Sequence, residues 1–91
     1  ETGRRCLLVN RLMADSVVGL PRAESDAMIE ELCLASEKPA HIYEHVWRPG
    51  DLLIWDNRCT LHARTDFDPA ERRVLRRMAI RGQRPIPAVA A

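Results

Sequence analysis

The sequence predicts a small domain of mainly β structure with one helix, an α+β fold. Two features carry this prediction. Apolar residues recur at helical spacing over about residues 22–36. In other segments the apolar residues form short runs or alternate with polar ones, which is typical of strands. These expected strands are residues 6–9, 41–47, 51–56 and 73–80.

The predicted helix over 22–36 has signals at both ends. Glu24 and Asp26 follow its start, where the helix dipole favours negative charge. Pro21 suits the first turn, since its fixed φ is compatible with a helix start. Pro39 follows the end, because proline cannot continue a helix. The helix is therefore expected to begin near residue 22 and to end near residue 36.

A tight turn is expected between the two central strands. Residues 41–47 alternate, and Arg48-Pro49-Gly50-Asp51 then places Pro and Gly at the two central positions of a type II turn. This turn leads into 51–56. Residues 6–9 are expected to form a buried strand, because they are a short apolar run between polar residues. The last residues, 85–91, contain two prolines and no periodicity, which predicts an extended or mobile tail.

Length and composition exclude several classes of protein. A chain of 91 residues forms at most one small domain, whose stability is marginal without a partner or a homo-oligomer. A formal net charge of +1 argues against binding to nucleic acid or to acidic membranes. The sequence has no long apolar run or signal-peptide pattern. The three cysteines are far apart and contain no CxxC pair, so a reducing cytoplasmic location is expected. Because the first residue is not methionine, the chain is expected to be a piece of a longer polypeptide.

Two histidines, His41 and His45, are four residues apart, a spacing that could hold zinc if they were on a helix. On a strand, the same spacing separates them by roughly 13 Å, which is too far for two ligands of one ion. The alternation of this segment therefore favours an interpretation of both as structural or surface histidines.

Arginines are concentrated near the C-terminal end. In a strand over 73–80, Arg73 and Arg77 would project to one face, and Arg72 and Arg76 fall on the other side of the alternation. A buried guanidinium needs an anionic partner, because an unpaired buried charge is strongly unfavourable. The partner could be a bound carboxylate or an acid of the protein. The available acids are Asp51, Asp56, Asp66, Asp68 and Glu71. The stretch has no aromatic residue for stacking on bases, which weakens a nucleic-acid interpretation.

A third histidine, His62, ends the run from Trp47 to His62. This run and several shorter motifs resemble the C-terminal part of the taurine dioxygenase and chlorophenoxyacetate dioxygenase family. The shorter motifs are Asp68-Pro69, Arg72-Arg73-Val74, Arg76-Arg77 and Gly82. The resemblance extends over nearly the whole chain, because segments near residues 1–10, 18–20 and 23–25 are also similar to the family.

The resemblance implies an Fe(II)- and 2-oxoglutarate-dependent oxygenase that hydroxylates a small anionic organic substrate and releases succinate and carbon dioxide. It implies that residues 1–84 are the C-terminal segment of a double-stranded β-helix, or jelly roll, incomplete on its own. His62 matches the family's second iron histidine and is the expected catalytic residue. Arg73 matches the arginine that binds 2-oxoglutarate, and Arg77 the one that often meets a sulfonate or carboxylate of the substrate. Trp55 either lines the pocket beside the metal and the cosubstrate or is a packing residue.

One family motif has no counterpart here. The family's iron also needs a histidine followed two residues later by Asp or Glu, and none of the three histidines has an acid at that position. We therefore expect the missing N-terminal half of the domain to supply these ligands, from the same gene or from another chain. The alternative is a non-catalytic remnant or interaction domain that lacks the metal site.

Overall fold

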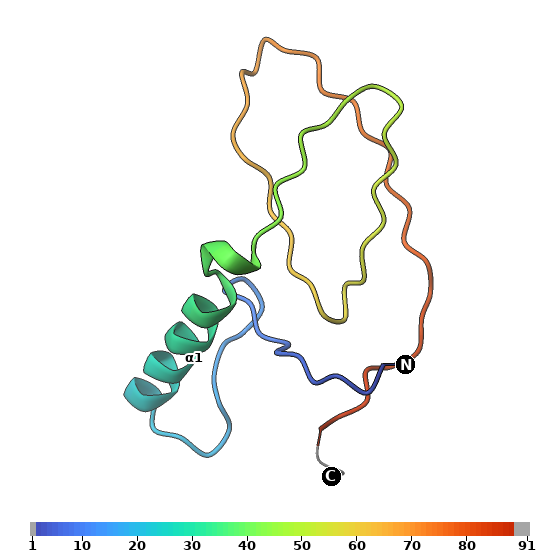
Figure 1. Ribbon diagram of the computed structural model, residues 1–91. Helices are drawn as coiled ribbons and strands as arrows, with labels where there is room; N and C mark the ends of the chain where they lie inside the picture. The colour runs from blue at the N-terminus through green and yellow to red at the C-terminus, as the bar shows by residue number, and fades with distance from the viewer. Residues whose placement is uncertain (1, 89–91) are drawn as a thin grey trace. The chain divides into compact units, whose positions relative to one another are not determined.

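The computed structural model describes residues 2–88 and contains one α-helix, α1 (Arg22–Ser36), followed by a single 3₁₀ turn, η1 (Pro39–His41). The other described residues form extended segments and turns (Figure 1). The chain divides into two compact units, and the boundary between them in the sequence falls between Leu61 and His62. We call them the first unit and the second unit and describe each separately.

Helix α1 confirms the prediction for residues 22–36. It begins directly after Pro21, whose carbonyl accepts a hydrogen bond from the Ser25 N–H at 2.9 Å. At the other end the Glu37 N–H donates to the Cys33 carbonyl at 3.0 Å. Pro39 follows two residues later and opens η1, as expected of a residue that cannot continue a helix.

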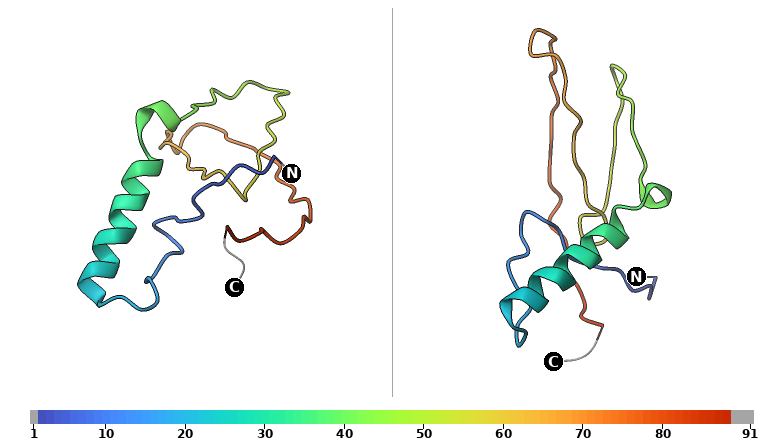
Figure 2. Two further views of the ribbon diagram at one scale, coloured as in Figure 1. Left: turned by 60° about the horizontal axis from the view of Figure 1, so that its bottom comes forward. Right: turned by 90° about the vertical axis from the view of Figure 1, so that its left-hand side faces the viewer.

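The small core of the first unit lies on one stripe of α1. Within residues 2–88, Ser25 and Cys33 are the buried side chains, each 1% exposed. They are eight residues apart, which places them on the same stripe of the helix. The Ser25 hydroxyl accepts a hydrogen bond from the Val17 N–H at 2.7 Å, so α1 holds the segment that precedes it. Both views of Figure 2 show this segment running back along the helix.

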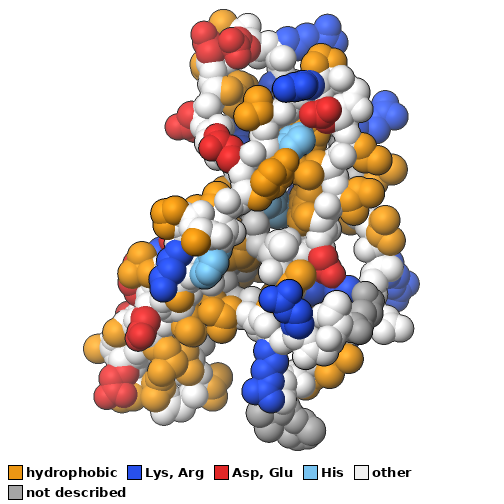
Figure 3. All heavy atoms as spheres, viewed as in Figure 1, with side chains coloured by type: hydrophobic (Ala, Val, Ile, Leu, Met, Phe, Trp, Pro, Cys, Tyr) orange, Lys and Arg blue, Asp and Glu red, His pale blue; other side chains and the backbone are white. Residues whose placement is uncertain are grey.

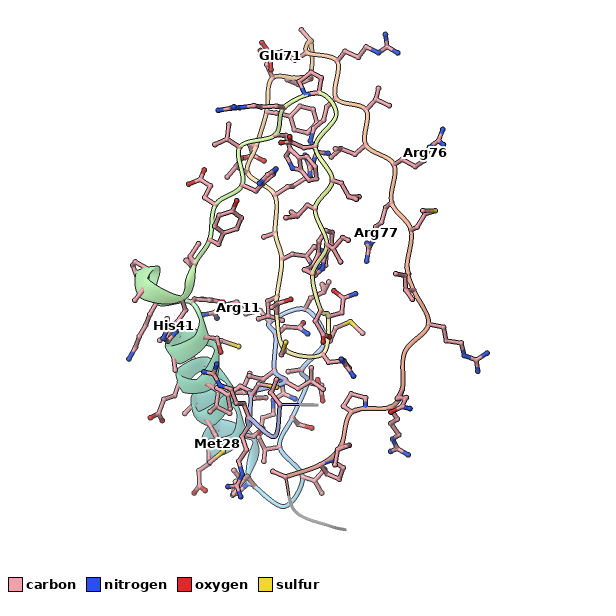
Figure 4. The ribbon with its side chains drawn as sticks, turned by 45° about the vertical axis from the view of Figure 1, so that its right-hand side comes forward. Arg11, Met28, His41, Glu71, Arg76 and Arg77 are labelled. Carbon is pink, nitrogen blue, oxygen red and sulfur yellow. The ribbon has the colours of Figure 1, made fainter. Side chains whose placement is uncertain are left out.

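Arg11 makes a second connection between that segment and α1. Its Nε and Nη2 donate to the two carboxylate oxygens of Glu37 at 2.8 and 3.0 Å, and Nη2 also donates to Glu30 at 3.1 Å. Figure 4 shows Arg11 beside the helix. The hydrogen bonds from Arg11 hold the pKa of Glu30 and that of Glu37 below their usual values. One guanidinium thus connects residue 11 to Glu30 of α1 and to Glu37, the residue directly after the helix.

Arg11→Gln is expected to reduce the helical content of the chain at neutral pH, and the difference from wild type should diminish as the pH falls through the lowered carboxyl pKa values. The pKa values of Glu30 and Glu37 are lowered in the folded state, so their contribution is present above the ordinary carboxyl pKa and is lost as the pH falls through the lowered values. The effect is expected to be small, because exposed ion pairs contribute little to stability. Circular dichroism at 222 nm, followed from pH 7 to pH 3, measures it.

Arg5→Gln is the matched control for this experiment. It removes the same charge from an exposed residue for which the described part of the chain contains no ion pair. Its helical content should follow the wild-type pH profile. A loss of helix in Arg11→Gln that does not diminish at all as the pH falls would contradict the ion-pair explanation.

The prediction of a mainly β fold is wrong. None of the expected strands forms, whether at 6–9, 41–47, 51–56 or 73–80, and the described residues contain no β-strand and no jelly roll. Outside the helices, each backbone hydrogen bond recorded between described residues joins residues three or four positions apart. Alternation favours a locally extended backbone, but a strand also needs hydrogen bonds to a neighbouring strand. That pairing is not a local property of the sequence.

The predicted burial of residues 6–9 is also wrong. Leu7 is 51% exposed and Leu8 is 64% exposed. The apolar run is therefore neither a strand nor part of the core. Of the predicted tail, residues 85–88 have no regular structure, and residues 89–91 lie outside the described part of the chain.

The predicted turn at residues 48–51 is confirmed. Gly50 has a φ of 89°, and the Asp51 N–H donates to the Arg48 carbonyl at 3.1 Å. A positive φ at the third residue with this hydrogen bond is the pattern of a type II turn, and glycine adopts it without a Cβ clash. The Asp51 carboxylate also accepts the Arg48 N–H at 3.0 Å. The turn forms without strands on either side, because all of its hydrogen bonds are local.

Large apolar side chains remain exposed in both units. In the first unit, Leu12 is 90% exposed and Met28, on α1, is 43% exposed. In the second unit, Met78 is 87% exposed and Ile80 is 90% exposed. Figure 3 shows hydrophobic side chains at the surface over α1. Monomeric soluble proteins rarely expose this much contiguous apolar surface. No helix within residues 2–88 is both long enough and apolar enough to cross a membrane.

Candidate functional site

In the first unit, the run from Trp55 to Thr60 is a hydrogen-bonded turn centred on Asp56. The Asp56 carboxylate accepts the Arg58 N–H at 2.8 Å and the Arg58 Nη2 at 2.7 Å. The Thr60 hydroxyl donates to the Asp56 carbonyl at 2.6 Å. The hydrogen bonds from Arg58 lower the pKa of Asp56 to about 2. Asp56 is therefore ionised at neutral pH, and its carboxylate accepts hydrogen bonds within this turn.

Trp55 is anchored by the same run. Its indole Nε1–H donates to the Asn57 side-chain oxygen at 2.7 Å, and the residue is 37% exposed. The ring is therefore not fully buried. A partly exposed ring held by a hydrogen bond can still form one wall of a binding surface.

The two spaced histidines of the first unit are hydrogen-bonded within the protein. His41 lies in η1, and its Nδ1 is 3.1 Å from the Ala35 carbonyl (Figure 4). His45 lies between the Tyr43 hydroxyl and the Asp51 carboxylate, each at 3.1 Å. These contacts support the interpretation of both as structural histidines, although the segment is not the expected strand.

The second unit contains His62, Arg73 and Arg77, all of which are exposed. The Arg73 guanidinium lies over the Phe67 ring, with Cζ 5.3 Å from the ring centroid. Arg64 lies against the same ring at 5.0 Å. Figure 4 shows Arg76 and Arg77 pointing to opposite sides of the extended segment that carries them, as alternation predicts.

The acids of the second unit do not pair with its two candidate arginines. The Asp68 carboxylate accepts the Ala70 N–H at 2.9 Å, and its carbonyl accepts the Glu71 N–H at 2.9 Å. Within the described residues of this unit, neither Arg73 nor Arg77 forms an ion pair with Asp or Glu. No carboxylate of the described second unit is therefore bound to the N–H donors of the Arg73 and Arg77 guanidiniums.

The described residues do not by themselves fit an iron site. In the part of the chain from 2 to 88, no three side chains of His, Cys, Asp or Glu lie close enough together to hold a metal ion. The iron site that the resemblance implies needs two imidazoles and one carboxylate. His62 is the one histidine of the second unit.

Phe67 and Arg11 were not among the residues singled out from the sequence. Phe67 is the single phenylalanine of the chain and lies between Arg64 and Arg73 in sequence, which is a weak signal for cation–π contacts. Arg11 gave no signal, because its partners, Glu30 on α1 and Glu37 directly after it, are 19 and 26 residues away.

Comparison with known proteins places the chain in a family of oxygenases. The family described as Taurine catabolism dioxygenase TauD, TfdA family matches residues 1–79. The chain therefore belongs to the TauD, TfdA family of dioxygenases. The resemblance seen in the run that ends at His62 is confirmed by this match.

Three curated relatives illustrate the similarity. Pentalenolactone F synthase of Streptomyces arenae is 42% identical over 78 residues, which is 86% of this chain and 26% of the relative. The (S)-phenoxypropionate/alpha-ketoglutarate-dioxygenase of Sphingobium herbicidovorans is 42% identical over 82 residues, 90% of this chain and 28% of the relative. The alpha-ketoglutarate-dependent 2,4-dichlorophenoxyacetate dioxygenase of Burkholderia sp. (strain RASC) is 39% identical over 83 residues, 91% of this chain and 28% of the relative.

The chain thus spans about a quarter of the length of these relatives. No solved structure matches it significantly.

Proposed function

We propose that this chain is part of an Fe(II)- and 2-oxoglutarate-dependent dioxygenase that hydroxylates a small anionic organic substrate and releases succinate and carbon dioxide. The observation that carries the proposal is the family match over residues 1–79, which includes His62, Arg73 and Arg77. Two of the relatives are named as alpha-ketoglutarate-dependent enzymes of phenoxy carboxylic acids. Their names favour a carboxylate over a sulfonate as the anionic group of the substrate.

Arg73 is proposed to bind the far carboxylate of 2-oxoglutarate. A guanidinium presents parallel N–H donors to a carboxylate and stays charged at any physiological pH. The absence of an ion pair for Arg73 within the described second unit supports this role. Arg77 is proposed to bind the anionic group of the substrate by the same chemistry. Trp55 is proposed to form part of the wall around the bound cosubstrate.

His62 is proposed to contribute one of the imidazoles that hold the iron, which when bound supplies the oxidising chemistry. The other histidine and a carboxylate would come from a segment with the His-x-Asp or His-x-Glu motif, in the same polypeptide or in another chain. The exposed apolar side chains of both units, such as Leu12 and Ile80, support a covering partner of this kind. A second copy of the chain lacks that motif and could not complete the site.

The proposal predicts different activities for the chain alone and for the complete protein, in which the chain is combined with that segment. The complete protein is expected to release carbon dioxide from 2-oxoglutarate when it is offered a panel of small carboxylates and sulfonates. The 91-residue chain alone is expected to release none and to retain no iron after gel filtration, because it supplies too few ligands.

Two results would count against this proposal. Decarboxylation by the purified chain would contradict the division of the site between segments. Failure of the complete, iron-loaded protein to consume 2-oxoglutarate with any member of the panel would contradict the enzymatic function and favour an interaction domain.

A further inference from the structure

Two guanidiniums share one aromatic ring in the second unit. The Cζ atoms of Arg64 and Arg73 lie 5.0 and 5.3 Å from the centroid of the Phe67 ring, both within the range of a cation–π interaction. Phe67 is 41% exposed, so the ring is reachable from solvent on part of its surface. Within the described residues of this unit, neither arginine has an ion pair with an acid.

A local turn brings Phe67 and Arg73 together. Directly after Phe67, Asp68 accepts hydrogen bonds from Ala70 N–H through its carboxylate and from Glu71 N–H through its carbonyl, each at 2.9 Å. These bonds reverse the chain, so that Arg73 returns to the ring six positions before it. The hydrogen-bonded turn therefore brings the backbone of Arg73 back toward the Phe67 ring.

A cation–π contact differs from an ion pair because it places no carboxylate on the N–H donors of the guanidinium. A guanidinium carries five such donors. A carboxylate partner would occupy two of those donors. Contact with Phe67 thus restricts the side chain of Arg73 while its donors stay available for a bound anion. Restricting a flexible side chain before binding reduces the entropy that binding has to overcome.

We propose that Phe67 is a positioning residue for Arg73, which it holds in place to bind the far carboxylate of 2-oxoglutarate. This inference rests on the proposed function, since it takes that role of Arg73 as its starting point. Arg64, against the same ring, adds a second positive charge beside the site. The ring offsets part of the repulsion between the two guanidiniums, because the face of an aromatic ring is electronegative.

The test compares two substitutions of Phe67 in the complete protein. Phe67→Leu keeps an apolar side chain but removes the ring, and is expected to weaken 2-oxoglutarate binding roughly two- to fivefold. Phe67→Tyr keeps the ring and is expected to bind 2-oxoglutarate as the wild type does. Isothermal titration calorimetry with 2-oxoglutarate measures the affinity directly. In steady-state kinetics, the KM for 2-oxoglutarate should rise in Phe67→Leu while kcat and the KM for the organic substrate are unchanged.

A double substitution separates positioning from a general effect on the fold. In an Arg73→Gln background, Phe67→Leu should cause no further loss of affinity, because two residues that act through one contact are not additive. An equal loss in both backgrounds would overturn the inference, as would wild-type affinity in a Phe67→Leu protein with an unchanged melting temperature. If Arg73→Gln itself leaves 2-oxoglutarate binding intact, the proposed role of Arg73 fails instead.

Discussion

His62→Ala in the complete protein is expected to reduce turnover to background and to abolish iron retention. The physical reason is that the described chain offers no replacement ligand for the iron. Iron in this type of site is held by three protein ligands, so the loss of one leaves a two-ligand site. The other histidines of the chain, His41 and His45, are hydrogen-bonded to Ala35 and to Tyr43 and Asp51. The measurements are carbon dioxide release from 2-oxoglutarate and the metal content of the protein after gel filtration.

His41→Ala is the matched control. It removes an exposed imidazole of the same chain whose Nδ1 is 3.1 Å from a backbone carbonyl. The His41→Ala protein should keep its iron and most of its turnover. If His62→Ala retained wild-type turnover, the assignment of His62 would be wrong, and the match of its motif to the family would concern the fold only.

Arg73→Ala is expected to weaken the affinity for 2-oxoglutarate by about 10- to 150-fold, the loss that corresponds to one charge-assisted hydrogen-bonded contact. Turnover at saturating 2-oxoglutarate should fall much less, because the far carboxylate lies away from the reacting end of the molecule.

Arg77→Ala should raise the KM for the anionic substrate more than the KM for 2-oxoglutarate. Steady-state kinetics with each reactant varied in turn measures both effects.

Arg76→Ala provides the control for both arginines. Arg76 is the neighbour of Arg77 and points to the opposite side of the same extended segment (Figure 4). Its replacement removes an equal charge, so any general electrostatic effect on anion binding appears in all three variants. A specific role requires that Arg73→Ala and Arg77→Ala exceed Arg76→Ala. If Arg77→Ala proves to be the variant with weak 2-oxoglutarate binding, the two roles are exchanged.

The size of the expected effects also separates direct contacts from supporting ones. Loss of Arg73 removes donors that bind the cosubstrate, whereas loss of the Phe67 ring only releases Arg73. A cation–π contact at a partly exposed position is weaker than a charge-assisted hydrogen bond. The effect of Phe67→Leu should therefore be clearly smaller than that of Arg73→Gln. An effect of equal size would indicate that the ring itself contacts the cosubstrate.

The features predicted correctly from the sequence are those fixed by neighbouring residues. Helix α1 was located from apolar spacing and its flanking prolines, because each of its hydrogen bonds spans four residues. The turn at Gly50 was located because a positive φ at that position favours glycine. Family membership followed from the run that ends at His62, since a motif is a property of the sequence itself.

The β prediction failed for the opposite reason. Alternation over 73–80 favours extended backbone, but a sheet requires a partner strand, and the described residues provide none. The sequence likewise does not show which acids pair with which arginines. Five acids were available for Arg73 and Arg77 from the sequence, yet among residues 62–88 neither arginine pairs with one.

The sequence by itself therefore determined the helix, the type II turn and the family of this protein, all of which depend on residues close together along the chain. The tertiary structure decided which charged groups have partners. It placed Arg11 between Glu30 and Glu37 and brought Arg73 against Phe67. Ion pairs and ring contacts depend on distance in space, and chain folding brings groups within a few ångströms that no pattern of spacing identifies in advance.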